Sequence, residues 1–360
     1  MLDKMKCVCH NQTMNSIREV AKQAGVSAAT VSRAFNAPEL ISPATHKHVL
    51  ETANRLNYRP LRTKTRKETR TLSPSQVETF IGFQFFSKTA GDLLQANSFY
   101  APILAGAQAE ASALGMHLLT NSTDRHQLEL ELPKMIREQT VGGMLLVGTA
   151  DPDLLALFLK RVPQIVLVDQ PDPTGQHDAL ITDGFGGTLA ATNYLISLGH
   201  KKIGFLRDNP DVLTFRDRLR GFVCAHFEAG LPIDPRLMVT TQCEEEVPAA
   251  LQGLLGTTDR PTAIVAANDS LAYAVMQACR TLRLRVPEDI SLVGFDDIAY
   301  SAQSWPPLTT VRVEKEQLGR LAVNRLQARL QSAGLPEEMP PITLQIPTSL
   351  IVRQSCRPLS

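Results

Sequence analysis

The sequence predicts an N-terminal all-α helix–turn–helix head followed by an α/β body with parallel sheets in two lobes. Two short helical patterns meet at a glycine within residues 16–36, which predicts the head. From residue 80 onward, short apolar runs alternate with helical patterns, which predicts buried parallel strands with covering helices. A chain of 360 residues also exceeds what one hydrophobic core organises, so several domains are expected.

The head begins with a helix that Ser16 and Glu19 can start as a capping box. Gly25 then supplies the backbone freedom that a turn between crossed helices needs. Ser27 is expected to cap a second helix that runs to about Asn36. Ser42 is expected to cap a third helix whose first residue is Pro43. The second helix of such a unit is shaped to enter a DNA major groove.

Charge is distributed unevenly along the chain. Residues 1–70 hold 13 Lys or Arg and 5 Asp or Glu, whereas the remainder holds 24 and 31. A basic head on an acidic body is the electrostatic footprint of a protein that binds a polyanion. Six of the basic residues lie within 59–70, where they form either a solvated linker or a segment that follows phosphates.

The body begins with a predicted strand at 79–83. The expected helices that follow are 101–114, 125–139, 152–161, 186–198, 215–229, 246–255 and 269–283. The expected strands between them are 116–120, 142–147, 165–169, 202–206, 237–240, 263–267 and 291–295. Parallel sheets of this kind bind ligands at the carboxyl ends of their strands.

The head resembles that of the lactose-repressor (LacI/GalR) family. The resemblance rests on VAKQAGVSAATVSRAFN and on ISPATHKHVLETANRLNYRP, which hold nearly every fixed position of the family motif. It implies a ligand-responsive transcription regulator, a repressor, that binds a double-stranded DNA operator as a homodimer. Ala28 and Ala29 then occupy the positions that select bases, and Arg33 reaches guanine or a phosphate. The expected DNA-binding residues are Ser27, Ala28, Ala29, Thr30, Ser32, Arg33, Asn36, Arg59, Arg62, Lys64 and Lys67.

The linker departs from the family pattern Y-x-P-N-x-x-A-R-x-L. Leu61 replaces the asparagine, and Lys67 stands where a leucine would wedge into the minor groove. Because an ammonium group cannot unstack bases as an apolar wedge does, we expect weaker kinking at the operator centre. A circular-permutation bending assay that finds a large central kink would contradict this expectation.

The body carries further family signatures, LISLGHKKIGFL, RDRLRGF, ANDSLAYAV and PPLTTVR. They imply the two-lobed type I periplasmic-binding-protein fold with the effector between the lobes. The resulting domains are 1–14 (disordered extension), 15–60 (DNA-binding head), 61–79 (basic linker), 80–352 (effector-binding and dimerisation body) and 353–360 (tail). One lobe takes about 80–181 and 314–342, and the other about 183–312 and 344–352.

Several polar residues stand where predicted strands end and therefore form a candidate effector pocket. The expected effector-binding residues are Phe99, Tyr100, Asp169, Arg216, Asn268 and Asp296. Arg216 and Asp169 also match effector-contacting positions of the family. Structural alternatives stay open, because Phe99 and Tyr100 could belong to the core. Carboxylates beside strand ends could also cap the following helices, a role expected for Asp269 and Asp297.

Other chemistries find little support in the sequence. Cys7 and Cys9 are spaced too tightly for a usual zinc half-site, and no clustered nucleophile and base suggest an enzyme, so no metal or cofactor is expected. No transmembrane or signal segment is recognised, and the scattered cysteines suit the cytoplasm. Carboxylate, amide and guanidinium groups favour a sugar effector. The alternatives are a sugar-binding protein whose head no longer reads DNA, and an α/β enzyme acting on a sugar or nucleotide.

Overall fold

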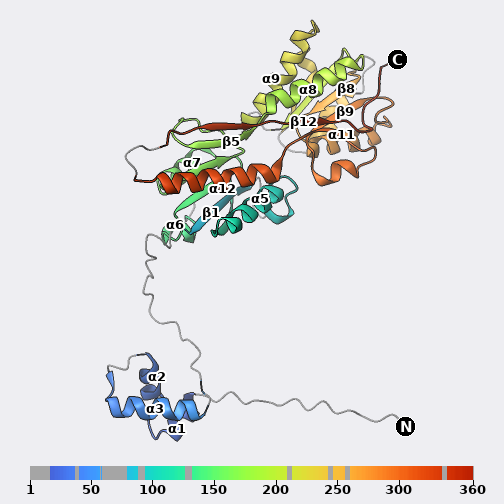
Figure 1. Cartoon of the computed structure of the whole chain (residues 1–360). Helices are drawn as coiled ribbons and strands as arrows, with labels where there is room; N and C mark the ends of the chain where they lie inside the picture. Colours follow the sequence, from blue (N-terminus) through green and yellow to red (C-terminus); the bar gives the residue numbers. More distant parts are fainter. Residues whose placement is uncertain are drawn as a thin grey trace, which may run out of the picture. The chain divides into compact units, whose positions relative to one another are not determined.

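The computed structural model describes residues 17–36, 40–56, 58, 79–87, 94–125, 132–208, 213–241, 246–255, 260–334 and 339–359. The chain forms two compact units, residues 1–71 and 72–360, which we describe separately (Figure 1). The N-terminal extension, the cap residue Ser16 and the linker residues Arg59, Arg62, Lys64 and Lys67 lie outside the described residues. The predictions made for them stay predictions.

The head is a bundle of three short helices, α1 (Ile17–Gln23), α2 (Ala28–Asn36) and α3 (Pro43–Arg55). Gly25 makes the turn after α1 with a φ of +65°. The Ser27 hydroxyl accepts from the Thr30 amide at 3.1 Å, and Ser42 accepts from the Thr45 amide at the same distance. Both predicted caps are therefore confirmed. The three helices share a core formed by Val20, Ala21, Ala24, Val31, Ala34, Val49 and Ala53.

The first lobe of the body is built on a six-stranded parallel sheet with the order β11-β5-β4-β3-β1-β2. Its strands are β1 (Phe80–Ser87), β2 (His117–Asp124), β3 (Gly143–Val147), β4 (Ile165–Val168), β5 (Asp178–Thr182) and β11 (Thr343–Ile346). The helices α5 (Tyr100–Ala113) and α12 (Lys315–Ser332) pack together over this sheet (Figure 1). Side chains of α6 (Lys134–Arg137) and α7 (Pro152–Leu159) form a second core with the sheet.

The second lobe repeats this plan with the strand order β12-β10-β9-β8-β6-β7. Its strands are β6 (Ile203–Asp208), β7 (Met238–Thr241), β8 (Ala263–Ala266), β9 (Ser291–Asp296), β10 (Thr309–Arg312) and β12 (Ser349–Ile351), and only β12 runs antiparallel to its neighbour. The helix α8 (Gly184–Ser197) packs with α9 (Leu213–Glu228), and α10 (Val247–Leu255) packs with α11 (Asp269–Thr281). The two-lobed α/β architecture with mostly parallel sheets confirms the predicted fold class.

Three chain crossings join the lobes, after β5, after β10 and after β11. The prediction of one last strand at 344–352 in the second lobe is wrong. Residues 343–346 instead pair with β5 in the first lobe, and only 349–351 pair with β10 in the second. The break falls at Pro347, which cannot donate to a strand ladder.

Two further expectations need correction. Within the described part of the helix predicted at 125–139, only 134–137 are helical, and residue 125 forms a turn directly after β2. The expected tail after residue 352 is part of the fold. The Ser355 side chain is fully buried, and its hydroxyl donates to the Leu292 carbonyl at 2.6 Å.

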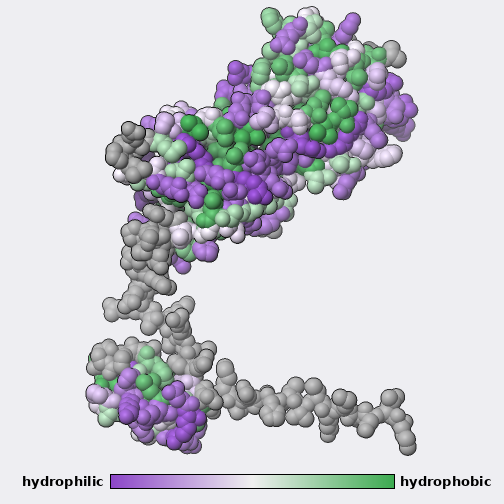
Figure 2. Space-filling view, viewed as in Figure 1, coloured by the Kyte–Doolittle hydropathy of each residue, from purple (hydrophilic) through white to green (hydrophobic). Residues whose placement is uncertain are grey.

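The surface view mixes hydrophilic and apolar residues on both units (Figure 2). No helix within the described ranges combines the length and apolar character needed to span a bilayer. Among those same residues, no three His, Cys, Asp or Glu side chains are grouped so that they could hold a metal ion. The Cys7–Cys9 pair lies outside the described residues.

Candidate functional site

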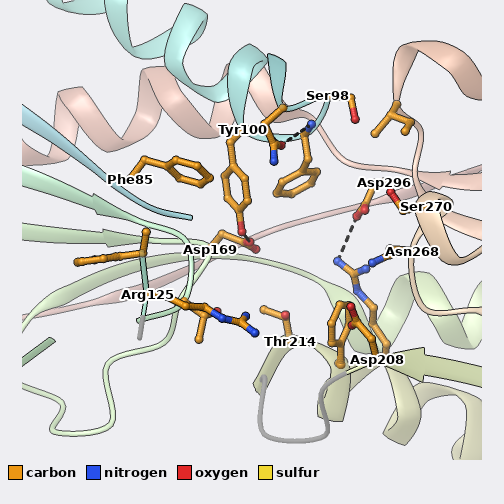
Figure 3. A pocket seen from close by; sticks show the side chains of 17 residues that line it. Phe85, Ser98, Tyr100, Arg125, Asp169, Asp208, Thr214, Asn268, Ser270 and Asp296 are labelled. Atoms are coloured by element: carbon orange, nitrogen blue, oxygen red, sulfur yellow. Dashed lines mark hydrogen bonds and ion pairs between the residues drawn. The ribbon is translucent and has the colours of Figure 1, made fainter. Parts of the chain in front are cut away.

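A cavity of about 220 Å³ lies between the two lobes at the carboxyl ends of their strands (Figure 3). Its lining comes from both sheets and from the starts of the helices that follow. The lining residues are Phe85, Phe86, Asn97, Ser98, Phe99, Tyr100, Arg125, Thr149, Asp169, Asp208, Thr214, Phe215, Arg218, Asn268, Ser270, Asp296 and Ile298. This is the edge at which parallel α/β sheets bind ligands.

On the side of the first lobe, a tyrosine and an aspartate form a buried pair. The Tyr100 hydroxyl donates to Asp169 Oδ2 at 2.8 Å. Asn97 fixes the start of α5, because its side-chain oxygen accepts from the backbone amides of Phe99 and Tyr100 at 3.0 and 2.9 Å. Burial is the main reason that the pKa values of both Tyr100 and Asp169 are raised.

On the side of the second lobe, Arg218 of α9 pairs with Asp296 at the end of β9, with 3.2 Å between Nη2 and Oδ1. The guanidinium also donates to the Ala267 carbonyl and stacks on the Phe295 ring, 3.8 Å from its centroid. Burial raises the pKa of Asp296 to about 6, although the charges of Arg218 and Lys315 oppose this rise.

On opposite sides of this pocket, the buried acceptor Asp169 Oδ1 and the buried donor Arg218 Nε have no hydrogen-bond partner among the described residues. Asp169 and Asp296 also take positive φ angles, 58° and 111°, which side-chain-bearing residues rarely adopt. Unsatisfied buried polar groups and backbone strain both concentrate at binding sites. The arrangement suits a ligand that accepts from the arginine and donates to the aspartate.

Five of the six predicted effector-binding residues line this cavity, namely Phe99, Tyr100, Asp169, Asn268 and Asp296. Arg216 does not, because it is exposed on α9 while Arg218 faces the pocket. Residues two apart on an α-helix point in nearly opposite directions, so only one of the two arginines can face inward. The arginine positioned to contact an effector is therefore Arg218, and the expectation for Arg216 is corrected.

The roles expected for Asp269 and Asp297, which were to cap the following helices, are also corrected. Asn268 caps α11 by accepting from the Leu271 amide at 2.8 Å, and it lines the pocket as well. Asp269, the expected cap, is fully buried and accepts from Ser301 and Thr310. Asp297 does not cap a helix but pairs with two arginines instead.

The residues that sequence reasoning missed follow the same rule as those that it found. Phe85 and Phe86 end β1, Asp208 ends β6, and Thr149 follows β3, all at carboxyl ends of strands. The strand predicted at 142–147 points to Thr149, but the strands predicted at 79–83 and 202–206 end too early to point to Phe85, Phe86 and Asp208. Arg125 and Thr214 have no such signal, because the strand predicted at 116–120 ends before Arg125 and the helix predicted at 215–229 begins after Thr214.

In the head, the leading face of α2 is open to solvent. Ser27, Ala28, Ala29 and Arg33 are exposed, and Val31 and Ala34 face the core. Thr30 and Ser32 are half-buried, and the Thr30 hydroxyl hydrogen-bonds with that of Ser27 at 2.9 Å. The last expected residue of this helix, Asn36, is described only in its backbone.

A helix–turn–helix head joined to a two-lobed body with a pocket between the lobes defines a class of DNA-binding transcription regulators. Residues 16–60 match the family model described as bacterial regulatory proteins, lacI family. Residues 192–356 match the periplasmic binding protein-like domain. Together with the full-length relatives below, these matches show that the chain belongs to the LacI family of bacterial transcription regulators.

The repressor PurR of Photobacterium profundum is 30% identical over 96% of this chain and 100% of its own length. The regulator DegA of Bacillus subtilis is 30% identical over 96% of this chain and 99% of its own length. Among solved structures, the CelR–cellobiose complex covers 95% of this chain and 99% of its own with a TM-score of 0.69 and 29% identity. The lac repressor dimer bound to operator and the anti-inducer ONPF covers 96% of this chain and 100% of its own, with a TM-score of 0.65 and 25% identity.

Proposed function

We propose that this protein is a cytoplasmic repressor that binds a pseudo-palindromic operator as a homodimer and responds to a small effector in the interlobe pocket. One head buries too little surface for tight specific binding, so two heads on two half-sites are needed. The effector acts by favouring one of two lobe arrangements and thereby one DNA affinity.

We infer that the effector is a neutral, hydroxyl-rich molecule of the sugar class. The observation that carries this inference is the pair of open atoms on opposite lobes, Asp169 Oδ1 and Arg218 Nε. A hydroxyl group both donates and accepts, so one polyol can satisfy both atoms. Aromatic rings beside them can cover the apolar face of a sugar ring, and the CelR relative was solved with cellobiose.

A ligand panel tests this proposal. Cellobiose, D-ribose and adenine are added separately to the full-length protein, and the melting temperature is recorded for each. Electrophoretic mobility shifts on the DNA upstream of its own gene are then measured with and without each compound. A sugar that raises the melting temperature and changes the DNA shift supports the proposal. A response to adenine alone contradicts the sugar class, and sugar binding without any DNA binding favours the alternative of a head that no longer reads DNA.

Arg33→Ala is expected to lower affinity for the specific operator by about 10- to 100-fold, because a bidentate contact to guanine contributes about 1–3 kcal/mol of discrimination. Random DNA should lose much less. Lys64→Ala, the comparison variant, should weaken all sequences alike and reduce the salt slope by about one. Fluorescence anisotropy at several salt concentrations measures both effects. If both variants lose equally on specific and random DNA, the assignment of Arg33 to base reading is wrong.

A further inference from the structure

A lysine of the first lobe reaches into the second lobe, directly behind the effector pocket. Lys315 is the first residue of α12, a helix that packs on α5, β3 and β4 of the first lobe. Its ammonium donates to the carbonyl oxygens of Asp296, the last residue of β9 in the second lobe, and of Asp297, which follows it, at 2.5 and 3.0 Å. It also donates to the Val313 carbonyl at 3.3 Å. All three donors of the ammonium therefore bind backbone oxygens, two at the end of β9 and one at the crossing that follows β10.

The backbone that Lys315 holds is in an unfavourable conformation. Asp296 and Asp297 have φ angles of 111° and 49°, in the region that side-chain-bearing residues rarely adopt. Such conformations persist only where neighbouring contacts hold them in place. The ammonium supplies two of those contacts by binding the carbonyl of each strained residue.

Each of the two strained residues connects to a different part of the body. The Asp296 side chain points into the pocket and pairs with Arg218 (Figure 3). The Asp297 carboxylate binds Arg312 at 2.8 Å and Arg353 at 2.7 Å. Arg312 ends β10 at the second crossing, and Arg353 follows β12, just beyond the third. A shift of the Asp296 backbone would therefore move groups at the pocket and at two crossings together.

We propose that Lys315 is the positioning residue that couples occupancy of the interlobe pocket to the relative orientation of the two lobes. The lysine does not line the pocket, so it acts through the backbone of Asp296 and Asp297. This inference rests on the proposed function, in which an effector in the pocket changes DNA affinity. Burial lowers the pKa of Lys315, while the surrounding carboxylates oppose this change.

The first test uses the full chain without ligand. Nitroxide-labelled p-acetylphenylalanine replaces the exposed residues Lys160 and Phe227, one on each lobe, and pulsed electron paramagnetic resonance measures the distance distribution between them. Lys315→Met keeps the aliphatic stem but removes the three donors, and we expect it to broaden this distribution. Lys201→Met, an exposed lysine of the second lobe, is the matched control and should leave it unchanged. A Lys315→Met distribution identical to that of the wild type would overturn the proposal.

The second test adds cellobiose and D-ribose as probes and measures their effect on DNA affinity. In the wild type, the ratio of DNA affinities with and without sugar should lie in the usual range for allosteric coupling, roughly 5- to 150-fold. In Lys315→Met this ratio should fall to near one, while calorimetry still detects sugar binding. Lys315→Arg should recover part of the coupling, because it keeps the charge and the donors. If the wild type binds neither sugar, the proposed effector class fails, but the distance measurement still decides the role of Lys315. If Lys315→Met and Lys315→Arg lose equal stability while the sugar still changes their DNA affinity as in the wild type, Lys315 is only a structural residue.

Discussion

Replacing Arg218 by methionine is expected to abolish the response to the effector and to lower the free energy of unfolding by about 3–5 kcal/mol. The methionine keeps the apolar stem beside Phe295, but it removes the charge that faces Asp296. A buried carboxylate then has no cation at hydrogen-bonding distance, which is the costly way to break a buried ion pair. The open Nε donor also disappears, and with it one of the two contacts expected for the ligand.

The loss of stability in Arg218→Met should depend on pH in a defined direction. The pKa of Asp296 is already raised to about 6 in the folded protein. Without the guanidinium it should rise further, so the folded variant binds a proton that the unfolded chain releases. Stability of the variant relative to wild type should therefore improve as the pH falls from 8 to 5. Urea titrations at both pH values measure this difference.

Arg216→Met is the matched control, on the same helix two residues away and exposed to solvent. It should change stability by less than about 0.5 kcal/mol and leave the effector response intact. If instead Arg216→Met abolishes the response while Arg218→Met retains it, the pocket has been assigned to the wrong arginine. Arg218→Lys separates charge from geometry, because it keeps the cation but cannot reach both Asp296 and the Ala267 carbonyl as a planar fork does.

The same arginine pair shows where sequence reasoning stops. Strand ends and caps are local features, and the Ser27 and Ser42 caps were correctly predicted from a few neighbouring residues. The inward face of α9 depends on the register of a helix whose apolar stripe is interrupted by three arginines. The resemblance placed the effector arginine at Arg216, two residues from the inward-facing Arg218, whose packing against Phe295 only the structure shows.

Contacts between distant segments were less accessible to sequence reasoning. Asn268 and Asp269 both suit a helix start, and their sequence neighbours do not distinguish them. Asp269 does not cap the helix, because its carboxylate accepts hydrogen bonds from the hydroxyls of Ser301 and Thr310, which are more than 30 residues away in the sequence. Likewise, the strand at 343–346 joins the first lobe through pairing with β5, about 160 residues earlier. Hydrophobic periodicity and secondary-structure propensity describe local sequence and carry no information on which distant segment will be the partner.

In the first lobe, α5 and α12 approach closely at Gly106 and Gly319, where a Cβ atom would meet the backbone of the opposite helix. Because Lys315 begins α12, its position is fixed by this helix pair. The same helix carries Arg325 and Arg329 toward its other end.

Asp178→Asn is expected to lower the free energy of unfolding by about 3–5 kcal/mol. The substitution removes the carboxylate to which both Arg325 and Arg329 bind. Asp178 begins β5 and is completely buried. Arg325 binds it at 2.6 and 3.1 Å, and Arg329 binds it at 2.7 and 2.9 Å. The Ile342 amide adds a fifth contact at 2.7 Å. One carboxylate thus joins α12, β5 and the segment before β11.

Acid should remove the same stabilisation that the substitution removes. The arginines lower the pKa of Asp178 to about 2, below its ordinary value of 3.8 in the unfolded chain. Its contribution is therefore present above about pH 4 and is lost as the pH falls through 2. The stability difference between wild type and Asp178→Asn, measured by urea titration, should be constant from pH 7 to 5 and shrink below pH 4.

Asp234→Asn provides the control, because Arg236 lowers the pKa of Asp234 to about 2 as well, but at the surface. The exposed pair should contribute far less to folding, since solvent screens both charges and the arginine remains hydrated when its partner is lost. Comparing the stability lost in Asp178→Asn with that lost in Asp234→Asn separates the effect of burying an ion pair from the effect of its charges. If both substitutions lower the urea midpoint equally, the buried contacts of Asp178 with α12 contribute no more than an ordinary surface ion pair, and the position of α12 must come from its packing on α5, β3 and β4.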